Sequence, residues 1–233
     1  MTASPSPTGS STTSRAGGPS AFAGFGEGAI EFYDGLAADN SKAYWTDHRH
    51  VYEHDVLAPM QALIAALEPE FGSGKIFRPY RDVRFSRDKT PYKTACGATA
   101  GPFYVQLSAD GLMAAGGGYR WEADQVARYR TAVDDERRGR DLAARLAAVG
   151  AATVDGARLV IAGDRLATRP RGVAPDHPRL ELLRHRSLYA HCGWPPDDTL
   201  HEAAAVQRVV AAWRAMRPLT EWLDNHVGPT APR

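Results

Sequence analysis

The segment F-Y-V-Q-L-S-A-D-G-L-M-A-A at residues 103–115 decides the fold class that we expect for this chain. Its apolar residues Phe103, Val105 and Leu107 alternate with more polar ones, which is typical of a half-buried β-strand. Asp110-Gly111 follows, and such a pair is a strong signal for a two-residue hairpin turn. The segment therefore predicts two antiparallel strands joined by a tight turn.

Helical periodicity lies on both sides of this hairpin. Apolar residues recur at helical spacing in residues 28–38. They do so again in residues 42–67, where Asn40 or Ser41 is expected to cap the helix and Pro59 to kink it or begin a new one. Because helices precede and follow the hairpin without strict strand-helix alternation, we predict a single α+β domain, with a mainly antiparallel sheet packed with helices.

A second set of short elements is expected after the hairpin. The pattern predicts helices at residues 122–137, after Gly139 and at residues 199–227, and strands at residues 158–162 and 188–193. Pro218 is expected to break the last helix, because proline lacks the backbone donor that a helix interior uses. Gly116-Gly117-Gly118, at the end of the return strand, indicates a bulge or a close approach by a ligand or by another backbone.

The ends of the chain differ in composition from its middle. Residues 1–20 are rich in Ser, Thr, Pro and Gly, so we expect a disordered N-terminal tail. The α+β domain is expected to cover residues 21–227, and residues 228–233 are expected to fray.

Overall composition excludes several classes of protein. Hydrophobic residues at 43% and charged residues at 24% are ordinary for a globular protein, and a formal net charge of +1 argues against a dedicated nucleic-acid binder. No run approaches the roughly 18 apolar residues that a membrane span needs, and the N-terminus lacks a signal-peptide core. Cys96 and Cys192 form neither a metal motif nor a disulfide framework, so we expect a cytoplasmic location.

Positive charge is concentrated in K-I-F-R-P-Y-R-D-V-R-F-S-R-D-K-T-P-Y-K-T, residues 75–94. If residues 81–87 are extended, Val83 and Phe85 point to the core, and Arg84 lies beside Asp82. Residues 89–93 are expected to form a turn, because their proline restricts its own backbone and that of the preceding residue. The cations of this stretch include Arg78, Arg81, Arg84, Arg87, Lys89 and Lys93, and only Asp82 and Asp88 offset them.

The first functional hypothesis is a site for a small phosphate- or carboxylate-bearing ligand. Guanidinium groups that are fixed by packing and pairing present forked N–H donors, whose geometry matches the oxygens of a phosphate or carboxylate. Its candidate residues are Arg78, Arg81, Asp82, Arg84, Asp88, Lys89, Tyr92 and Lys93. The titratable groups that a reaction could use are Asp82, Asp88, Tyr92 and His177. No nucleophile, metal site or cofactor fingerprint is recognisable, so the sequence assigns neither a reaction nor a cofactor.

Two other interpretations of the same stretch stay open. An RNA- or DNA-binding module would use the cations for phosphates and Tyr80, Phe85 and Tyr92 for base stacking, although the near-neutral net charge counts against it. In the other interpretation the two aspartates hold the arginines in a structural ion-pair network, and function lies elsewhere.

The stretch resembles the signature of the domain-of-unknown-function 2461 family, whose pattern is matched at residues 78–94. Further resemblances lie at Tyr52 and at residues 39–45, 116–118, 169–172 and 176–178, so that the likeness covers about residues 22–225. The chain departs from the family pattern at Asp39, Ala43 and Tyr44, where Asn, Glu and Trp are expected. The resemblance implies a shared fold and site, and it carries no established activity.

Three histidines and one further arginine are the candidate functional residues outside the cationic stretch. His50 and His54 are one helical turn apart, but they lack the glutamate order of the helical zinc motif, so we expect a solvated face and no metal site. His177 is a candidate general base, whereas Asp176 is an alternative cap for a helix beginning near Pro178. Arg130 follows the glycine-rich segment and is expected to add to the anion site.

Overall fold

The computed structural model describes residues 21–84 and 87–230, and within them six strands form one antiparallel sheet in the order β1-β2-β3-β4-β8-β7. A separate two-stranded ribbon pairs β5 (Thr153–Val154) with β6 (Ala157–Arg158). The main sheet consists of β1 (Gly74–Ile76), β2 (Ala95–Ala100), β3 (Phe103–Ser108), β4 (Gly111–Gly118), β7 (Val160–Ala162) and β8 (Leu188–Trp194). These elements confirm the predicted α+β class and the antiparallel hairpin. The turn lies one residue earlier than predicted, at Ala109-Asp110, because Gly111, the first residue of β4, already pairs with Ser108.

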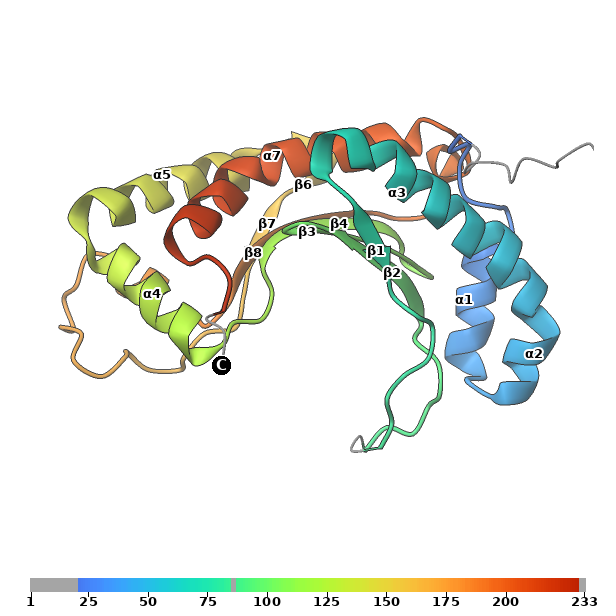
Figure 1. Ribbon diagram of the computed structural model, residues 1–233, viewed down its shortest axis with the longest axis horizontal. Coiled ribbons are helices and arrows are strands. Elements are labelled where there is room, and N and C mark those ends of the chain that lie inside the picture. The colour runs from blue at the N-terminus through green and yellow to red at the C-terminus, as the bar shows by residue number, and fades with distance from the viewer. Residues whose placement is uncertain (1–20, 85–86, 231–233) are drawn as a thin grey trace, which may run out of the picture.

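The helices cover one side of a curved sheet. They are α1 (Ala29–Ala38), α2 (Lys42–Val51), a π-helical segment (Tyr52–Leu57), α3 (Ala58–Phe71), α4 (Ala123–Asp134), α5 (Glu136–Ala151), α6 (Leu180–Leu183), a 3₁₀ turn (Asp198–His201) and α7 (Ala205–His226). Figure 1 shows α3, α5 and α7 along the convex side of the sheet, and the segment between β1 and β2 projecting from its concave side. None of the helices in the described part of the chain is long and apolar enough to cross a membrane.

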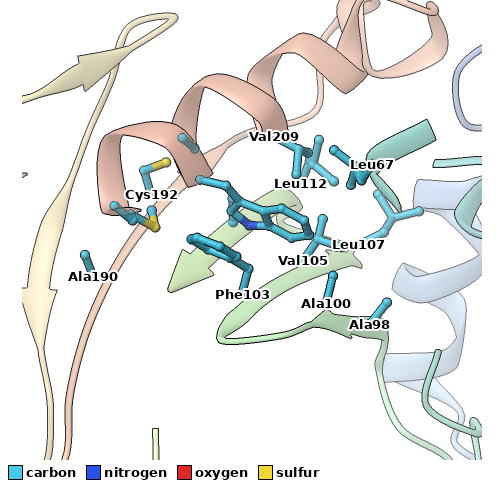
Figure 2. Packing of buried hydrophobic residues seen from close by; sticks show 14 of the residues in the cluster. Leu67, Ala98, Ala100, Phe103, Val105, Leu107, Leu112, Ala190, Cys192 and Val209 are labelled. Atoms are coloured by element: carbon cyan, nitrogen blue, oxygen red, sulfur yellow. The ribbon is translucent and has the colours of Figure 1, made fainter. Parts of the chain in front are cut away.

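The core fills the layer between the convex face and these helices. Figure 2 shows Val105 and Leu107 of β3 gathered with Leu67 of α3 and Val209 of α7, all of them buried. The ring of Trp213 on α7 stacks on Phe103 at a centroid distance of 5.1 Å. Alternate residues of β3 therefore point into the core, as the sequence pattern predicted, and the residues between them point to the concave face.

Strand β2 has the composition Ala-Cys-Gly-Ala-Thr-Ala, which has little intrinsic preference for a strand, and the sequence pattern did not predict it. Its position is instead set by pairing with β3, from Ala95 opposite Ser108 to Ala100 opposite Phe103. Packing favours glycine at position 97, because a Cβ there would lie 2.3 Å from the hydroxyl of Tyr104. The small residues of β2 thus let large side chains of β3 lie across the sheet.

Helix boundaries agree with the sequence in some places and differ in others. Ser41 caps α2, since its Oγ accepts a hydrogen bond from the Tyr44 amide at 3.1 Å. Pro59 lies in the first turn of α3, directly after the π-helical segment. The backbone stays helical at Leu57 and Ala58, so α3 continues that segment and the fresh helix that was one of the two expectations does not form. The boundary expected at Gly139 was wrong, because Asp135 caps α5 by accepting from the Arg138 amide at 2.9 Å.

The break expected at Pro218 was also wrong, because α7 continues through it. The helix face on both sides of the proline is buried, with Trp213, Leu219 and Trp222 among its core residues. That packing holds the helix together where one backbone hydrogen bond is lost. The chain end at residues 228–230, where we expected fraying, is held to α4: Gln125 Nε2 donates to the Gly228 carbonyl oxygen at 2.8 Å.

Candidate functional site

The cationic stretch forms a loop between β1 and β2, and residues 78–93 are called the signature loop below. The alternation considered for residues 81–87 required them to be extended, and those of them that are described form no regular strand. Instead, Tyr80 and Tyr92 form an isolated antiparallel bridge that closes the loop. The Arg81 amide donates to the Pro91 carbonyl oxygen at 2.8 Å. Val83 is half-buried, and the predicted inward direction of Phe85 lies outside the described residues.

The base of the signature loop is clamped by the segment before α2. Asn40 Nδ2 donates to the Tyr92 carbonyl oxygen at 3.1 Å, and its Oδ1 accepts from the Tyr92 amide at 3.0 Å. The Tyr92 ring is 5% exposed and stacks on Trp45, with centroids 4.4 Å apart and planes 7° apart. Asn40 therefore acts as a clamp and not as the helix cap that was one of the two expectations, and Tyr92 is a packing residue.

Charged side chains within the signature loop pair with one another. The Arg84 guanidinium donates to both carboxylate oxygens of Asp82, at 2.9 and 2.7 Å, as the sequence spacing predicted. Arg81 bonds to Asp88 and, at 2.6 Å, to the Thr90 hydroxyl. The pairs are solvent-exposed, so they contribute to the loop's shape more than to overall stability.

Hydrogen bonds lower the pKa of Asp88 from an ordinary 3.8 to about 2. The largest contributions come from the amide and hydroxyl of Thr90, followed by Arg81. Lys89 donates from its ammonium group to the Val83 carbonyl oxygen at 2.9 Å. These contacts link residues 81–83 with residues 88–90 of the loop.

The concave face of the sheet contains a hollow of about 640 Å³, called the concave hollow below. In its floor the Tyr104 hydroxyl donates to Gln106 Oε1 at 2.8 Å, and burial raises the pKa of this phenol. It is lined by Phe77, Thr99, Gly101, Pro102, Phe103, Tyr104, Gln106, Met113, Ala115, Gly116, Gly117, Tyr119, Tyr189 and His191. The lining combines aromatic rings with hydroxyl, amide and imidazole groups, which is the composition of a small-molecule site.

The signature loop meets the concave hollow at Phe77. The Lys93 ammonium lies over the Phe77 ring, 5.3 Å from its centroid. Lys75 pairs with Thr99 across β1 and β2, and cross-strand partners share a face of the sheet. Lys93 therefore contacts one residue of the hollow lining, and Lys75 lies on the same face of the sheet as another. Of the predicted site residues, the structure brings Lys93 to the hollow, whereas Arg81, Asp82, Arg84 and Asp88 pair within the loop and Tyr92 is buried.

His177 lies elsewhere in the fold, because it is not among the residues that line the concave hollow. Its Nε2 is 3.1 Å from the Asp134 carboxylate, and its Nδ1 accepts from the Arg179 amide at 3.0 Å. The alternative role for Asp176 as a cap was wrong, since α6 begins after Arg179 and has no side-chain cap. Among the described residues, no group of three or more histidine, cysteine or acidic side chains could hold a metal ion.

A comparison with protein families matches residues 28–222 to the conserved hypothetical protein family DUF2461. The chain belongs to this family. No curated protein and no solved structure matches the chain. Within this DUF2461 fold, two of the segments that carry the family resemblance are in direct contact, because Asn40 holds Tyr92. A third, Gly116-Gly117-Gly118, contributes its first two glycines to the concave hollow.

The sequence pattern missed the floor of the hollow in this DUF2461 chain. Tyr104 and Gln106 occupy the outward positions of β3, and Tyr189 and His191 occupy those of β8. The pattern treats such positions as the solvent face of an antiparallel sheet. The available signal was their chemistry, because rings and an imidazole at alternate positions of two strands are unusual for a merely solvated face.

Proposed function

We propose that the protein binds a small anionic ligand, bearing a phosphate or carboxylate group, in the concave hollow. The ligand's planar or apolar part contacts the rings of the hollow, and its anionic group faces the edge formed by Lys93 and Lys75. The single observation that carries this proposal is the position of the Lys93 ammonium over Phe77, a residue of the hollow lining.

The charge of the lining supports an anion over a cation. Among the described residues that line the concave hollow there is no aspartate or glutamate. Burial raises the pKa of the Tyr104 phenol, so this group is uncharged at neutral pH and adds no negative charge to the lining. Lys93 and Lys75 add positive charge at one edge, and an anion there meets attraction without a competing carboxylate in the lining.

The signature loop has a supporting part in this proposal. Its internal pairs, Arg81 with Asp88 and Arg84 with Asp82, hold the wall from which Lys93 emerges. The ion-pair interpretation and the ligand interpretation thus apply to different residues of one loop. We keep Arg78 and Lys89, which are exposed, as candidates for longer-range attraction of the ligand.

The RNA- or DNA-binding alternative is the less favoured one. Its stacking groups included Tyr92, whose ring is buried against Trp45 and cannot receive a base. Tyr80 remains 50% exposed, and Phe85 lies outside the described residues, so one of the two described stacking groups is open to a base. A cytoplasmic setting is retained in the proposal, since Cys96 and Cys192 are both free thiols.

A thermal-shift screen tests the proposal, with phosphorylated metabolites, nucleotides, dicarboxylates, short RNA and divalent metals as probes. A ligand at 100 times its dissociation constant stabilises the native state by about 2.7 kcal/mol, which is readily detected. Met113→Trp would fill the hollow, because Met113 lies on its floor between Gln106 and Gly193. The matched control is Ala148→Trp, which adds the same ring at an exposed position of α5, outside the lining residues.

We expect the stabilising anion to lose its effect in Met113→Trp and to keep it in Ala148→Trp. A stabilising anion that acts equally on both variants would place its site away from the hollow. If no small anion stabilises the wild-type protein, whereas RNA does so with a steep dependence on salt, the nucleic-acid alternative replaces the proposal.

A further inference from the structure

A second cavity of about 550 Å³ lies next to the concave hollow and shares Tyr119 with it. We call it the arginine cleft. Tyr119 is 78% exposed, and its ring centroid is 5.5 Å from that of Tyr189 in the hollow. The arginine cleft is lined by Tyr119, Arg120, Trp121, Ala123, Val126, Arg130, Asp164, Leu166, Arg186 and Ser187.

The charge of the arginine cleft is strongly one-sided. Its lining contains three arginines, Arg120, Arg130 and Arg186, and one carboxylate, Asp164, so that three positive charges less one negative charge leave +2. The whole chain, by contrast, has a formal net charge of +1. Cations gathered in a cavity attract an anion more strongly than the same cations spread over a surface.

Neighbouring groups hold parts of the cleft in place. Arg130 Nε donates to the Leu183 carbonyl oxygen at 3.3 Å, which fixes the side chain and leaves its terminal nitrogens for another acceptor. The Asp164 amide donates to the Ser187 hydroxyl oxygen at 2.7 Å, so this buried hydroxyl retains its own hydrogen as a donor. Arg186 pairs with the Asp164 carboxylate.

Arg120 differs from the other two arginines. Within the described parts of the chain, its guanidinium makes no hydrogen bond or salt bridge, and the residue is exposed. It directly follows Tyr119, the residue shared by the two cavities. An anion in the cleft would bond to the Arg120 guanidinium without breaking a hydrogen bond or salt bridge inside the protein. The free energy of the new hydrogen bonds would therefore contribute to binding with little loss elsewhere.

We propose that the arginine cleft is a second anion site and that it binds the dianionic phosphate group of a phosphate monoester. A tetrahedral dianion presents three oxygens to three arginines and balances the local charge of +2, whereas a planar carboxylate carries one charge and two oxygens. The site goes beyond the function proposed for the concave hollow and does not depend on it. A phosphate ester whose organic part extends past Tyr119 would reach both cavities.

Inorganic phosphate is the probe that tests this site. It is titrated into the full chain at pH 8 and constant ionic strength, and binding is followed by amide chemical shifts. We expect saturable shifts at residues 119–121 and at Ser187. Arg120→Gln should weaken binding about tenfold or more, because it removes charged hydrogen bonds to the anion. Arg186→Gln is the second variant, and it should weaken binding as well.

The control is Arg140→Gln, which removes an exposed arginine of α5 that pairs with Glu136. It should leave the phosphate-induced shifts at residues 119–121 and at Ser187 unchanged. Acetate should bind at least tenfold more weakly than phosphate. The proposal is overturned if phosphate causes no saturable shifts, if Arg120→Gln binds as tightly as the wild type, or if acetate matches phosphate.

Discussion

The side chain of Asn40 replaces a strand partner for Tyr92. It donates to the Tyr92 carbonyl oxygen at 3.1 Å and accepts from the Tyr92 amide at 3.0 Å. A residue 52 positions away in the sequence thus satisfies both backbone groups at the base of the signature loop. This pair of hydrogen bonds joins the loop to the segment before α2, and the stack of Tyr92 on Trp45 joins it to α2 itself.

Removal of this clamp should destabilise the fold. Asn40→Ala leaves the Tyr92 amide and carbonyl without their partner, and we expect a loss of about 1–3 kcal/mol in the free energy of unfolding, measured with urea. Asn225→Ala, at an exposed position near the end of α7, is the control and should change stability little. Equal stability of the two variants would mean that water replaces the clamp at no cost.

The two tyrosines that close the signature loop should differ in their effect on stability. Tyr92 is 5% exposed and Tyr80 is 50% exposed. We expect Tyr92→Ala to cost about 3–5 kcal/mol, as for other large aromatic residues in a core. Tyr80→Ala should cost about 1 kcal/mol or less, because it loses only a partly exposed ring contact. A small loss for Tyr92→Ala in thermal or urea unfolding would argue that its ring is available for a ligand.

Acid should loosen the signature loop over a defined range of pH. The pKa of Asp88 is lowered in the folded state, so the contribution of its carboxylate is fully present above its unfolded value of 3.8. That contribution is lost as pH falls towards about 2. We expect an NMR titration of the Asp88 carboxyl to show this low midpoint, with the Thr90 amide shifting at the same pH. Asp88→Asn should abolish the Thr90 transition. A midpoint near 4 would contradict the hydrogen bonds seen here.

Both cysteines should be unreactive in the folded protein. Cys96 and Cys192 are each 2% exposed, and burial raises the pKa of each thiol to about 12. Because the thiolate is the reacting species, a chromogenic disulfide reagent at pH 8 should label neither thiol in the native state. It should label both in denaturant. Rapid labelling of the native protein would show that β2 or β8 opens readily.

Much of the fold follows from local pattern. The hairpin joining β3 and β4 was predictable because turn chemistry and alternation agree there, although its turn residues are Ala109 and Asp110 and not Asp110 and Gly111. Strand β2 was not, since its alanines and glycine carry no strand signal and its place depends on pairing with β3. Pro218 misled the prediction for a similar reason, because the burial of α7 on both sides of it is a tertiary effect.

The candidate site was predictable only in part. The charge cluster and the Asp82–Arg84 pair can be read from spacing in the sequence. The direction of each cation cannot, because it depends on how the loop folds back on itself: Arg81 turns to Asp88, whereas Lys93 reaches Phe77. The concave hollow joins residues from β2, β3, β4 and β8, and the sequence order of these residues does not reveal that they share one face.

Isothermal titration of the anion that stabilises the protein, compared between Lys93→Met and Lys42→Met, tests the central claim most directly. Methionine keeps the apolar stem of Lys93 beside Phe77 and removes its charge, and Lys42, at the start of α2, provides the matched control. We predict that Lys93→Met weakens binding about tenfold or more, the loss expected for one charged contact, and that Lys42→Met binds as the wild type does. Equal affinity of both variants for the anion would contradict an anion site at the edge of the concave hollow.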